Sequence, residues 1–255
     1  MRSNVWFPFE RERNSSKNML FCFHHAGGTA SLYRDWIRWS DQIQVIPVEL
    51  PGKATRMGEK FAVNMHNTSK EIAGQIVSEA EHADIWLYGH SMGAVLAFSV
   101  ACALEKKYGK HIKKLIVSGR HAPQDQVEET YRSTMGDKAL VTELRRLGGT
   151  PEELLENSEV SKYILPTIKA DYRLNESYQY TGEMLHCPIS AYAGNQDTDA
   201  PFALMENWES VTDGPFRIFE EEGSHFFPTE LGRSYWKKIE KEILRDQKSC
   251  VFMQA

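Results

Sequence analysis

The segment Gly89-His90-Ser91-Met92-Gly93 places a serine between two glycines, each two positions away. It follows the apolar run 85–88 and precedes a helix-like run, 94–108. On a sharp turn between a strand and a helix, a serine hydroxyl is lifted above the end of the sheet and can act as a nucleophile. Glycines are needed around it because side chains there would collide with the neighbouring strand and helix. We predict that Ser91 is a catalytic nucleophile, and the alternative is an ordinary helix-capping serine.

A serine hydroxyl is a poor nucleophile near neutral pH and needs a histidine base. The histidines after Ser91 are His111, His121, His186 and His225. His225 directly follows the last strand-like run, so its loop can bring the ring over the serine. His111 and His186 precede predicted strands and belong to the opposite end of the sheet. We predict His225 as the base, with His121, which follows a strand, as its competitor.

The acid that orients the histidine is expected between the serine and the histidine in chain order. The segment after the penultimate predicted strand offers Asp197 and Asp199. We prefer Asp197, because Gly194 permits the chain to turn and three residues then bring the carboxylate back towards the histidine. Asp199 is the alternative, although it suits the N-cap of a following helix. An acid after the strand near residue 118 is disfavoured, because the first carboxylate there is Asp125.

Acyl transfer also needs hydrogen-bond donors for the negatively charged oxygen of the tetrahedral intermediate. The N–H of Met92, the residue after the nucleophile, is expected to supply one. The loop His24-His25-Ala26-Gly27-Gly28 follows the first predicted strand, and its glycines allow close backbone approach. We predict the N–H of Ala26 as the second donor. A plain glycine-rich turn is the alternative, and the phosphate-binding glycine patterns are absent from this loop.

Strand-like apolar runs alternate with helix-like runs along the chain, which predicts an α/β fold with a mostly parallel central sheet flanked by helices. The predicted strands are 20–24, 45–49, 85–89, 114–118, 189–193 and 216–220, and the predicted flanking helices are 67–80, 95–104 and 235–243.

About seventy residues between Ser118 and Ile189 contain no convincing strand, which is too long for an ordinary connection. Helix-like stretches occur there at 138–147, 152–156 and 160–174, punctuated by Gly148-Gly149 and by Pro166 within the last of them. We interpret the interval as a helical lid over the end of the sheet, inserted at about 125–185 into a single domain spanning 1–255. The alternative, a second independent domain, is disfavoured because the following strands complete the first sheet.

Composition excludes several classes of protein. A net charge of −5 argues against general nucleic-acid binding, and no apolar stretch is long enough to span a membrane. The N-terminus lacks the features of a secretory signal, and the four cysteines form no C-x-x-C pair. We therefore expect a cytoplasmic protein with reduced cysteines. The histidines show no metal-ligand spacing, so we expect no metal site.

These motifs resemble those of the external, type II thioesterases of non-ribosomal peptide and polyketide synthesis, which belong to the α/β-hydrolase superfamily. The two lid segments make the resemblance specific, because esterases and lipases share the G-x-S-x-G pattern. Departures occur at His24, Lys53, Lys169 and Ser224, and they concern substrate contacts rather than the reaction class. The matching segments are 23–28, 49–53, 89–93, 144–151, 165–172 and 223–227.

The resemblance implies hydrolysis of acyl thioesters on the phosphopantetheine arm of a carrier protein, without a cofactor of the enzyme's own. It also implies that stalled or wrongly primed acyl groups are the usual substrates. Carrier proteins are usually acidic, so the basic lid residues Arg145, Arg146 and Lys169 are docking candidates, although each equally suits a solvated helix face.

Three other functions remain open at this stage: a carboxylesterase or lipase acting on oxygen esters, a non-catalytic acyl-binding protein, and a chain-releasing enzyme that cyclises its product. The sequence does not define the acyl chain, because specificity depends on pocket shape. It does not determine the oligomeric state either, and a monomer is our working expectation.

Overall fold

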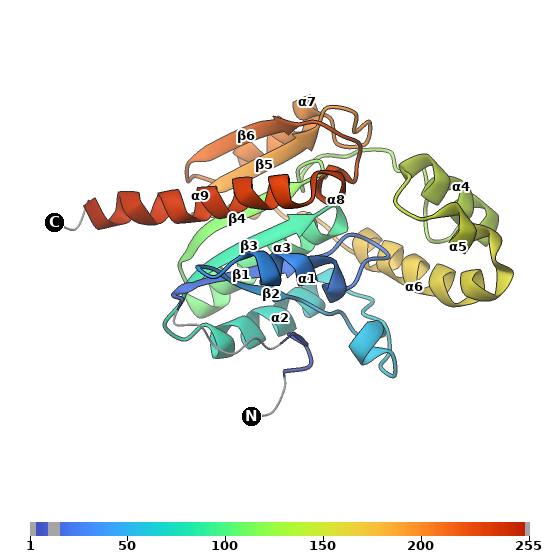
Figure 1. Ribbon diagram of the computed structural model, residues 1–255, viewed down its shortest axis with the longest axis horizontal. Helices are drawn as coiled ribbons and strands as arrows, with labels where there is room; N and C mark the ends of the chain where they lie inside the picture. Colours follow the sequence, from blue (N-terminus) through green and yellow to red (C-terminus); the bar gives the residue numbers. More distant parts are fainter. Residues whose placement is uncertain (1–3, 10–15, 253–255) are drawn as a thin grey trace.

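One sheet of six parallel strands organises the computed structural model, which describes residues 4–9 and 16–252 (Figure 1). Its strand order is β2-β1-β3-β4-β5-β6. Each predicted strand overlaps one of the observed strands, so the predicted parallel sheet is confirmed. The strands are β1 (Asn18–Phe23), β2 (Gln44–Pro47), β3 (Asp84–His90), β4 (Ile112–Ser118), β5 (Ile189–Gly194) and β6 (Phe216–Glu221).

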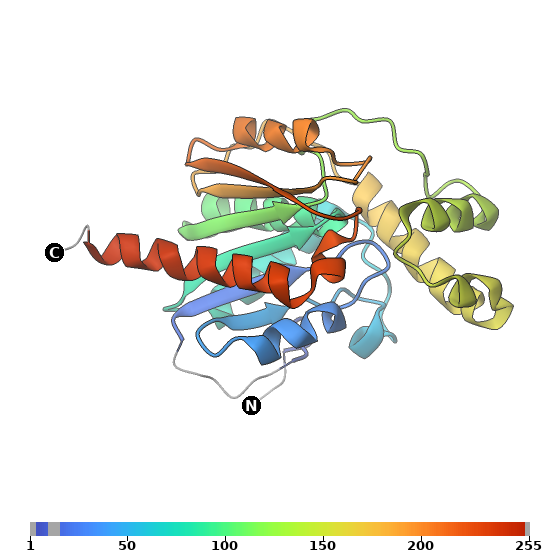
Figure 2. The same cartoon turned by 45° about the horizontal axis from the view of Figure 1, so that its top comes forward.

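Helices cover both faces of the sheet, because parallel neighbours must be joined by crossovers that pass over a face. Successive residues of a strand therefore enter different apolar clusters. Phe21 and Leu87 pack with α2 (Met65–Glu79) and α3 (Met92–Tyr108), whereas Leu20 and Trp86 pack on the other face. That other face is covered by α1 (Arg34–Trp39) and α9 (Arg233–Phe252) (Figures 1 and 2).

Short helices fill the remaining connections. They are the 3₁₀ helices η1 (Ala30–Tyr33), η2 (Ala54–Arg56) and η3 (Glu206–Val211), and the α-helices α7 (Phe202–Met205) and α8 (Phe227–Leu231).

The interval between β4 and β5 forms a group of helices at the carboxyl end of the strands, which we call the lid (Figures 1 and 2). It contains α4 (Asp137–Leu147), α5 (Glu152–Glu156) and α6 (Ser158–Glu176). Side chains such as Leu140 and Leu165 form a separate small apolar cluster inside the lid. Leu174 of α6 instead joins the apolar cluster on the sheet face that α2 and α3 cover. This shared packing supports our proposal of one domain with an inserted lid.

The predicted helical stretch 160–174 lies within α6, which continues through Pro166. A proline inside a helix removes one backbone N–H and leaves the carbonyl four residues earlier without its helical partner. Pro166 and Lys162 are both exposed, so water can satisfy that carbonyl. Gly148 does end α4, with a left-handed φ of 83° at the C-cap.

The buried cysteines Cys22, Cys102 and Cys187 are free thiols. Burial raises the pKa of Cys102 to about 12, so this thiol stays protonated at neutral pH. The side chain of Cys250, and the first three residues of the N-terminal stretch considered above, lie outside the described residues. Across the described helices, none is both long enough and apolar enough to cross a membrane.

Packing of α2 on the sheet can be tested at Ile76, which is fully buried. Ile76→Ala should lower the free energy of unfolding by about 2–5 kcal/mol, because the lost side chain leaves a cavity in a dense core. Lys70→Ala on the exposed side of the same helix is the matched control and should change it by less than about 0.5 kcal/mol. Urea unfolding would measure both, and equal effects would contradict the packing described here.

Candidate active site

Ser91 lies at the tight turn between β3 and α3 in a backbone conformation that is rare for a residue with a side chain, with φ of 55° and ψ of −124°. Its N–H donates to the carbonyl of Ser118 on the neighbouring strand, over 2.9 Å. A Cβ at Gly89 would lie 2.1 Å from the carbonyl oxygen of Gly93, and one at Gly93 would lie 2.2 Å from that of Phe23. These contacts explain the two glycines of the motif.

The structure brings Ser91, His225 and Asp197 together at the carboxyl edge of the sheet. His225 Nε2 lies 3.1 Å from Ser91 Oγ, and His225 Nδ1 lies 2.9 Å from Asp197 Oδ2. His225 follows β6 and Asp197 follows β5, so the two loops end beside the turn that carries Ser91. This is the hydrogen-bonded order that a serine nucleophile, a histidine base and an orienting acid require.

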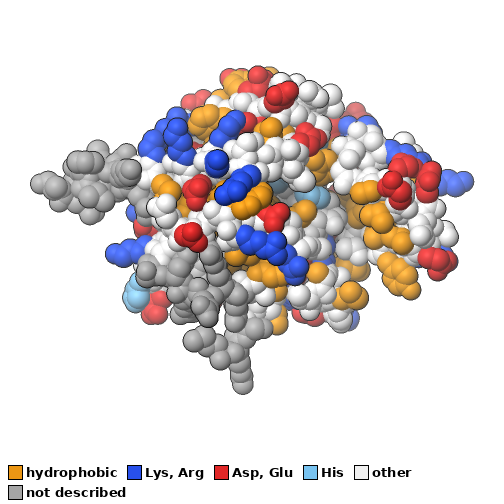
Figure 3. Space-filling model, in the orientation of Figure 1, with side chains coloured by type: hydrophobic (Ala, Val, Ile, Leu, Met, Phe, Trp, Pro, Cys, Tyr) orange, Lys and Arg blue, Asp and Glu red, His pale blue; other side chains and the backbone are white. Residues whose placement is uncertain are grey.

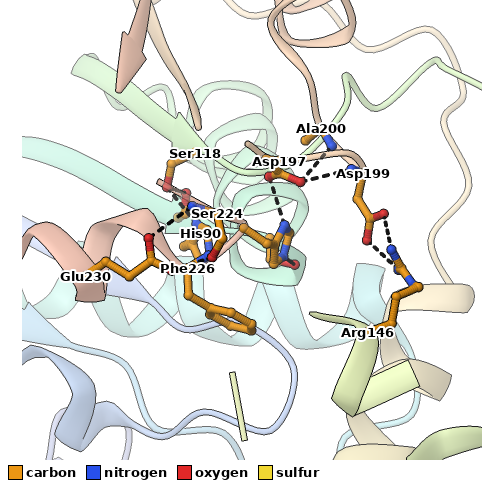
Figure 4. A network of polar contacts seen from close by, with 12 residues as sticks. His90, Ser118, Arg146, Asp197, Asp199, Ala200, Ser224, Phe226 and Glu230 are labelled. Carbon is orange, nitrogen blue, oxygen red and sulfur yellow. Dashed lines mark hydrogen bonds and ion pairs between the residues drawn. The ribbon is translucent and has the colours of Figure 1, made fainter. Parts of the chain in front are cut away.

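Asp197 is buried, yet its carboxylate is well supplied with donors. Burial acts to raise its pKa, but hydrogen bonds from His225 and from two backbone N–H groups lower the pKa below the ordinary value. Those N–H groups belong to Asp199, at 2.9 Å, and Ala200, at 3.2 Å (Figure 4). The carboxylate is therefore held ionised and pointing at the histidine.

Asp199, the alternative acid, points elsewhere. Both of its oxygens accept hydrogen bonds from Arg146 of the lid helix α4, each over 2.7 Å (Figure 4). Arg146 also binds Glu143 one turn earlier on α4. The carboxylate of Asp199 thus connects the loop after β5 to the lid and does not contact the histidine.

The competing histidine, His121, lies near the site but is engaged differently. Its Nδ1 is 3.2 Å from the carbonyl of Ala122, and its Nε2 is 3.8 Å from Glu129. His186 pairs with Asp213 at the opposite end of the sheet. Of the histidines that follow the serine, His225 is the one in hydrogen-bonding contact with it within the described chain.

The two predicted oxyanion donors flank the serine. Met92 is the first residue of α3, where backbone N–H groups have no partner inside the helix. Ala26 lies on the loop after β1. Ala26, Ser91, Met92 and His225 all line one cavity of about 250 Å³. The two predicted donors therefore share one cavity with the serine and the histidine, and their role as donors stays a prediction.

A second and larger cavity, of about 1050 Å³, is also lined by Ser91 and extends to the helices of the lid. Its lining is mostly apolar, with Leu144 and Ile168 from the lid and Met57 and Phe61 from the loop after β2. The smaller cavity is polar by comparison and includes Arg120 and other charged side chains. Hydrophobic side chains gather on the lid near this hollow, and a histidine is visible between the lid and the rest of the molecule (Figure 3).

Each basic lid residue considered for docking already has an acidic partner. Arg145 Nε donates to Glu152 over 2.9 Å, and Lys169 Nζ donates to Asp137 over 2.6 Å. Arg146 is bound to Glu143 and Asp199 as described above. These pairs favour the interpretation of Arg145 and Lys169 as side chains of a solvated helix face rather than as docking residues. Arg146 instead links the lid to the core.

Sequence reasoning missed the buried contact between Lys53, after β2, and Asp171 of α6. Both residues lie in matching segments, but nothing in their spacing indicates that positions 118 apart meet. It also missed the chemistry of three neighbouring histidines. Burial lowers the pKa of His24 and His90 well below 6.5, and the pKa of His25 falls to about 4. In the described part of the chain, no group of three His, Cys, Asp or Glu side chains is arranged to hold a metal ion.

A parallel sheet flanked by helices, a serine on the turn after a central strand, and a helical insertion over the carboxyl edge define an enzyme of the α/β-hydrolase fold. The thioesterase domain family matches residues 18–242. This chain belongs to that family and is an enzyme that hydrolyses thioesters. The resemblance found from the motifs is therefore confirmed.

The relatives cover almost the whole chain. It is 33% identical over 239 residues to "Gramicidin S biosynthesis protein GrsT" of Aneurinibacillus migulanus, covering 93% of this chain and 92% of that protein. It is 30% identical to "Thioesterase PikA5" of Streptomyces venezuelae, covering 95% and 86%. The solved structure of the type II thioesterase BorB from the borrelidin biosynthetic cluster superposes with a TM-score of 0.84 at 32% identity, covering 94% and 98%.

The buried neutral histidines predict a loss of stability in mild acid. The unfolded rings of His24 and His90 take up protons near pH 6.5, whereas the folded rings stay neutral. The free energy of unfolding should therefore fall as pH drops below about 6, by about 1.4 kcal/mol per pH unit for each ring.

Urea unfolding between about pH 7 and 5 would measure this slope. His90→Gln should reduce the slope by the contribution of one histidine ring. His111→Gln, at an exposed histidine, is the matched control. An equal slope in all three proteins would contradict the role assigned to the buried rings.

Proposed function

We propose that this enzyme hydrolyses acyl thioesters from the phosphopantetheine arm of carrier proteins, and so clears stalled or wrongly primed acyl groups from polyketide or non-ribosomal peptide synthases. The observation that carries the proposal is similarity along the whole chain, lid included, to type II thioesterases such as BorB. The apolar cavity of about 1050 Å³ beside Ser91 supports it, because an acyl chain needs such a space.

In the proposed reaction, Ser91 Oγ attacks the thioester carbonyl carbon while His225 Nε2 takes the serine proton. The carbonyl π bond opens, and the N–H groups of Ala26 and Met92 donate to the resulting oxyanion. Asp197 keeps the imidazole in the correct tautomer and stabilises its positive charge.

When the tetrahedral intermediate collapses, the carbon–sulfur bond breaks and the pantetheine sulfur receives the proton from His225. Water then attacks the acyl carbon while His225 takes one of its protons. The bond from that carbon to Ser91 Oγ breaks, His225 returns the proton to Oγ, and a carboxylic acid leaves. Every step uses groups of this chain and water, so we propose that no cofactor takes part. The partner is a carrier protein that brings its own phosphopantetheine arm.

Ser91→Ala should abolish turnover and leave the protein folded, because the substitution removes only the nucleophilic oxygen. Mass spectrometry of acyl-loaded carrier protein, before and after incubation, measures the reaction directly, and a matched oxygen ester is the comparison substrate. Wild-type hydrolysis of the oxygen ester alone would favour a carboxylesterase. Absence of turnover together with no labelling of Ser91 by a serine-reactive probe would favour a binding protein.

The assignment of the acid can be tested with two neighbouring carboxylates on one loop. Asp197→Asn should lower kcat on the order of 10³–10⁴-fold, because the histidine then loses its tautomer and charge partner. Asp199→Asn is the matched control and should change kcat by less than about tenfold, since it affects only the contact with Arg146. The reverse ranking in steady-state assays would reassign the acid.

A further inference from the structure

The lid helix α6 contacts the loop of the proposed oxyanion donor through two side chains one turn apart. Asp171 Oδ2 accepts a hydrogen bond from the N–H of Gly27 over 2.7 Å. Ile168 packs directly above the same residue, and a Cβ on Gly27 would lie 3.0 Å from its Cγ1. Gly27 also has a φ of 82°, so a side chain at this position would be strained for a second reason.

The peptide groups on both sides of Ala26 are held by hydrogen bonds. The carbonyl of His25 accepts from the N–H of Gly28 over 3.0 Å and lies 2.8 Å from His24 Nδ1. The carbonyl of Ala26 lies 2.9 Å from His25 Nδ1, and the N–H at the other end of that peptide group is bound by Asp171. The direction of the Ala26 N–H depends on both groups. The contacts of the His25–Ala26 peptide group come from the core loop itself. The lid contributes to the contacts of the Ala26–Gly27 peptide group.

Lys53 supplies the positive charge that accompanies this carboxylate. Its ammonium contacts the same oxygen, Asp171 Oδ2, and the two side chains are only 1% and 5% exposed. Burial raises the pKa of Asp171, while Lys53 and the Gly27 N–H act against that rise. A charged acceptor makes a stronger hydrogen bond to a backbone N–H than a neutral one does.

We infer that Asp171 is a positioning residue: by holding the N–H of Gly27, its carboxylate aligns the oxyanion donor of Ala26 only while α6 is packed on the core. Packing of α6 on the core and alignment of the oxyanion donor are thereby coupled. This inference rests on the proposed function, since the role of Ala26 is part of it.

Two double variants separate the effect of the hydrogen-bond acceptor at position 171 from the effect of its charge. Lys53→Met with Asp171→Asn removes both charges but keeps an oxygen for Gly27. Lys53→Met with Asp171→Leu removes both charges and the acceptor. Replacing both members of a buried ion pair by residues of similar volume avoids leaving one charge unpaired, so both variants are expected to fold, which circular dichroism would verify.

Three quantities should be measured for each variant: kcat on acyl carrier protein, affinity for an alkyl trifluoromethyl ketone, and affinity for the matching thioether. The ketone reports on the oxyanion hole, because Ser91 Oγ adds to its carbonyl carbon, the serine proton passes to His225, and the carbonyl oxygen becomes the anion. The thioether fills the same cavity and forms no oxyanion.

Relative to the Asn double variant, the Leu double variant should lose about 10²-fold in kcat and in ketone affinity, with thioether affinity unchanged within about threefold. The inference is overturned if the two variants agree within about threefold in kcat and ketone affinity. It is also overturned if thioether affinity falls as far as ketone affinity, because that result would mean general damage to the pocket.

The single variant Asp171→Asn provides a second test that keeps the shape of the side chain. It should reduce kcat and ketone affinity together by about tenfold, because the acceptor loses its charge. No change in either quantity would overturn the inference. Lys114→Met with Glu242→Gln replaces another buried lysine–carboxylate pair, near the start of β4, and should leave kcat within about twofold.

The proposed function can fail separately. If wild-type protein binds the ketone at Ser91 but does not hydrolyse carrier thioesters, the substrate assignment is wrong. The ketone affinities of the Asn and Leu double variants would still decide the role of Asp171.

Discussion

The close approach of α3 to β1 and β3 is the constraint on which the rest of the site depends. The carbonyls of Gly93 and Phe23 occupy the space that side chains at the two motif glycines would need, so the chain can turn from strand to helix only with glycine at these positions. That turn holds Ser91 at a positive φ above the edge of the sheet. Since all the strands are parallel, the loops after β1, β5 and β6 end at the same edge. The arrangement of the proposed catalytic residues is thus a consequence of strand direction.

The lid is more than a cover for the apolar cavity, because it contacts both loops beside the serine. Arg146 of α4 binds Asp199, two residues after the proposed acid, and that ion pair is about one-third exposed. Asp171 of α6 binds Gly27, next to the proposed oxyanion donor, and the ion pair of Asp171 with Lys53 is buried. An exposed pair is weakened by salt and reforms readily, whereas a buried one is costly to break. The α6 side is therefore the firmer attachment, and the α4 side is the one suited to open.

Much of the fold and part of the site followed from local pattern. Continuous apolar runs predicted the strands because both sheet faces are covered, and the position of each histidine relative to a strand indicated which end of the sheet it occupies. Asp197 and Asp199 could be ranked only by the length of the turn, since the difference between them is the direction of two side chains on one loop. The pairing of Lys53 with Asp171 was not predictable, because it depends on how the lid packs on the core. Pro166 does not end the predicted helix 160–174, because both Pro166 and Lys162 are exposed and water can satisfy the carbonyl that loses its helical partner.

The ring of His90 packs beside that of His225, and His25 packs beside His90, with centroid separations of 5.2 Å and 5.9 Å. Burial keeps both neighbours uncharged at neutral pH. In the proposed mechanism the transferred proton is therefore held on His225, and neither of these two rings places a positive charge beside it. The additional histidines thus surround His225 with neutral rings, and one imidazole of the cluster carries the proton.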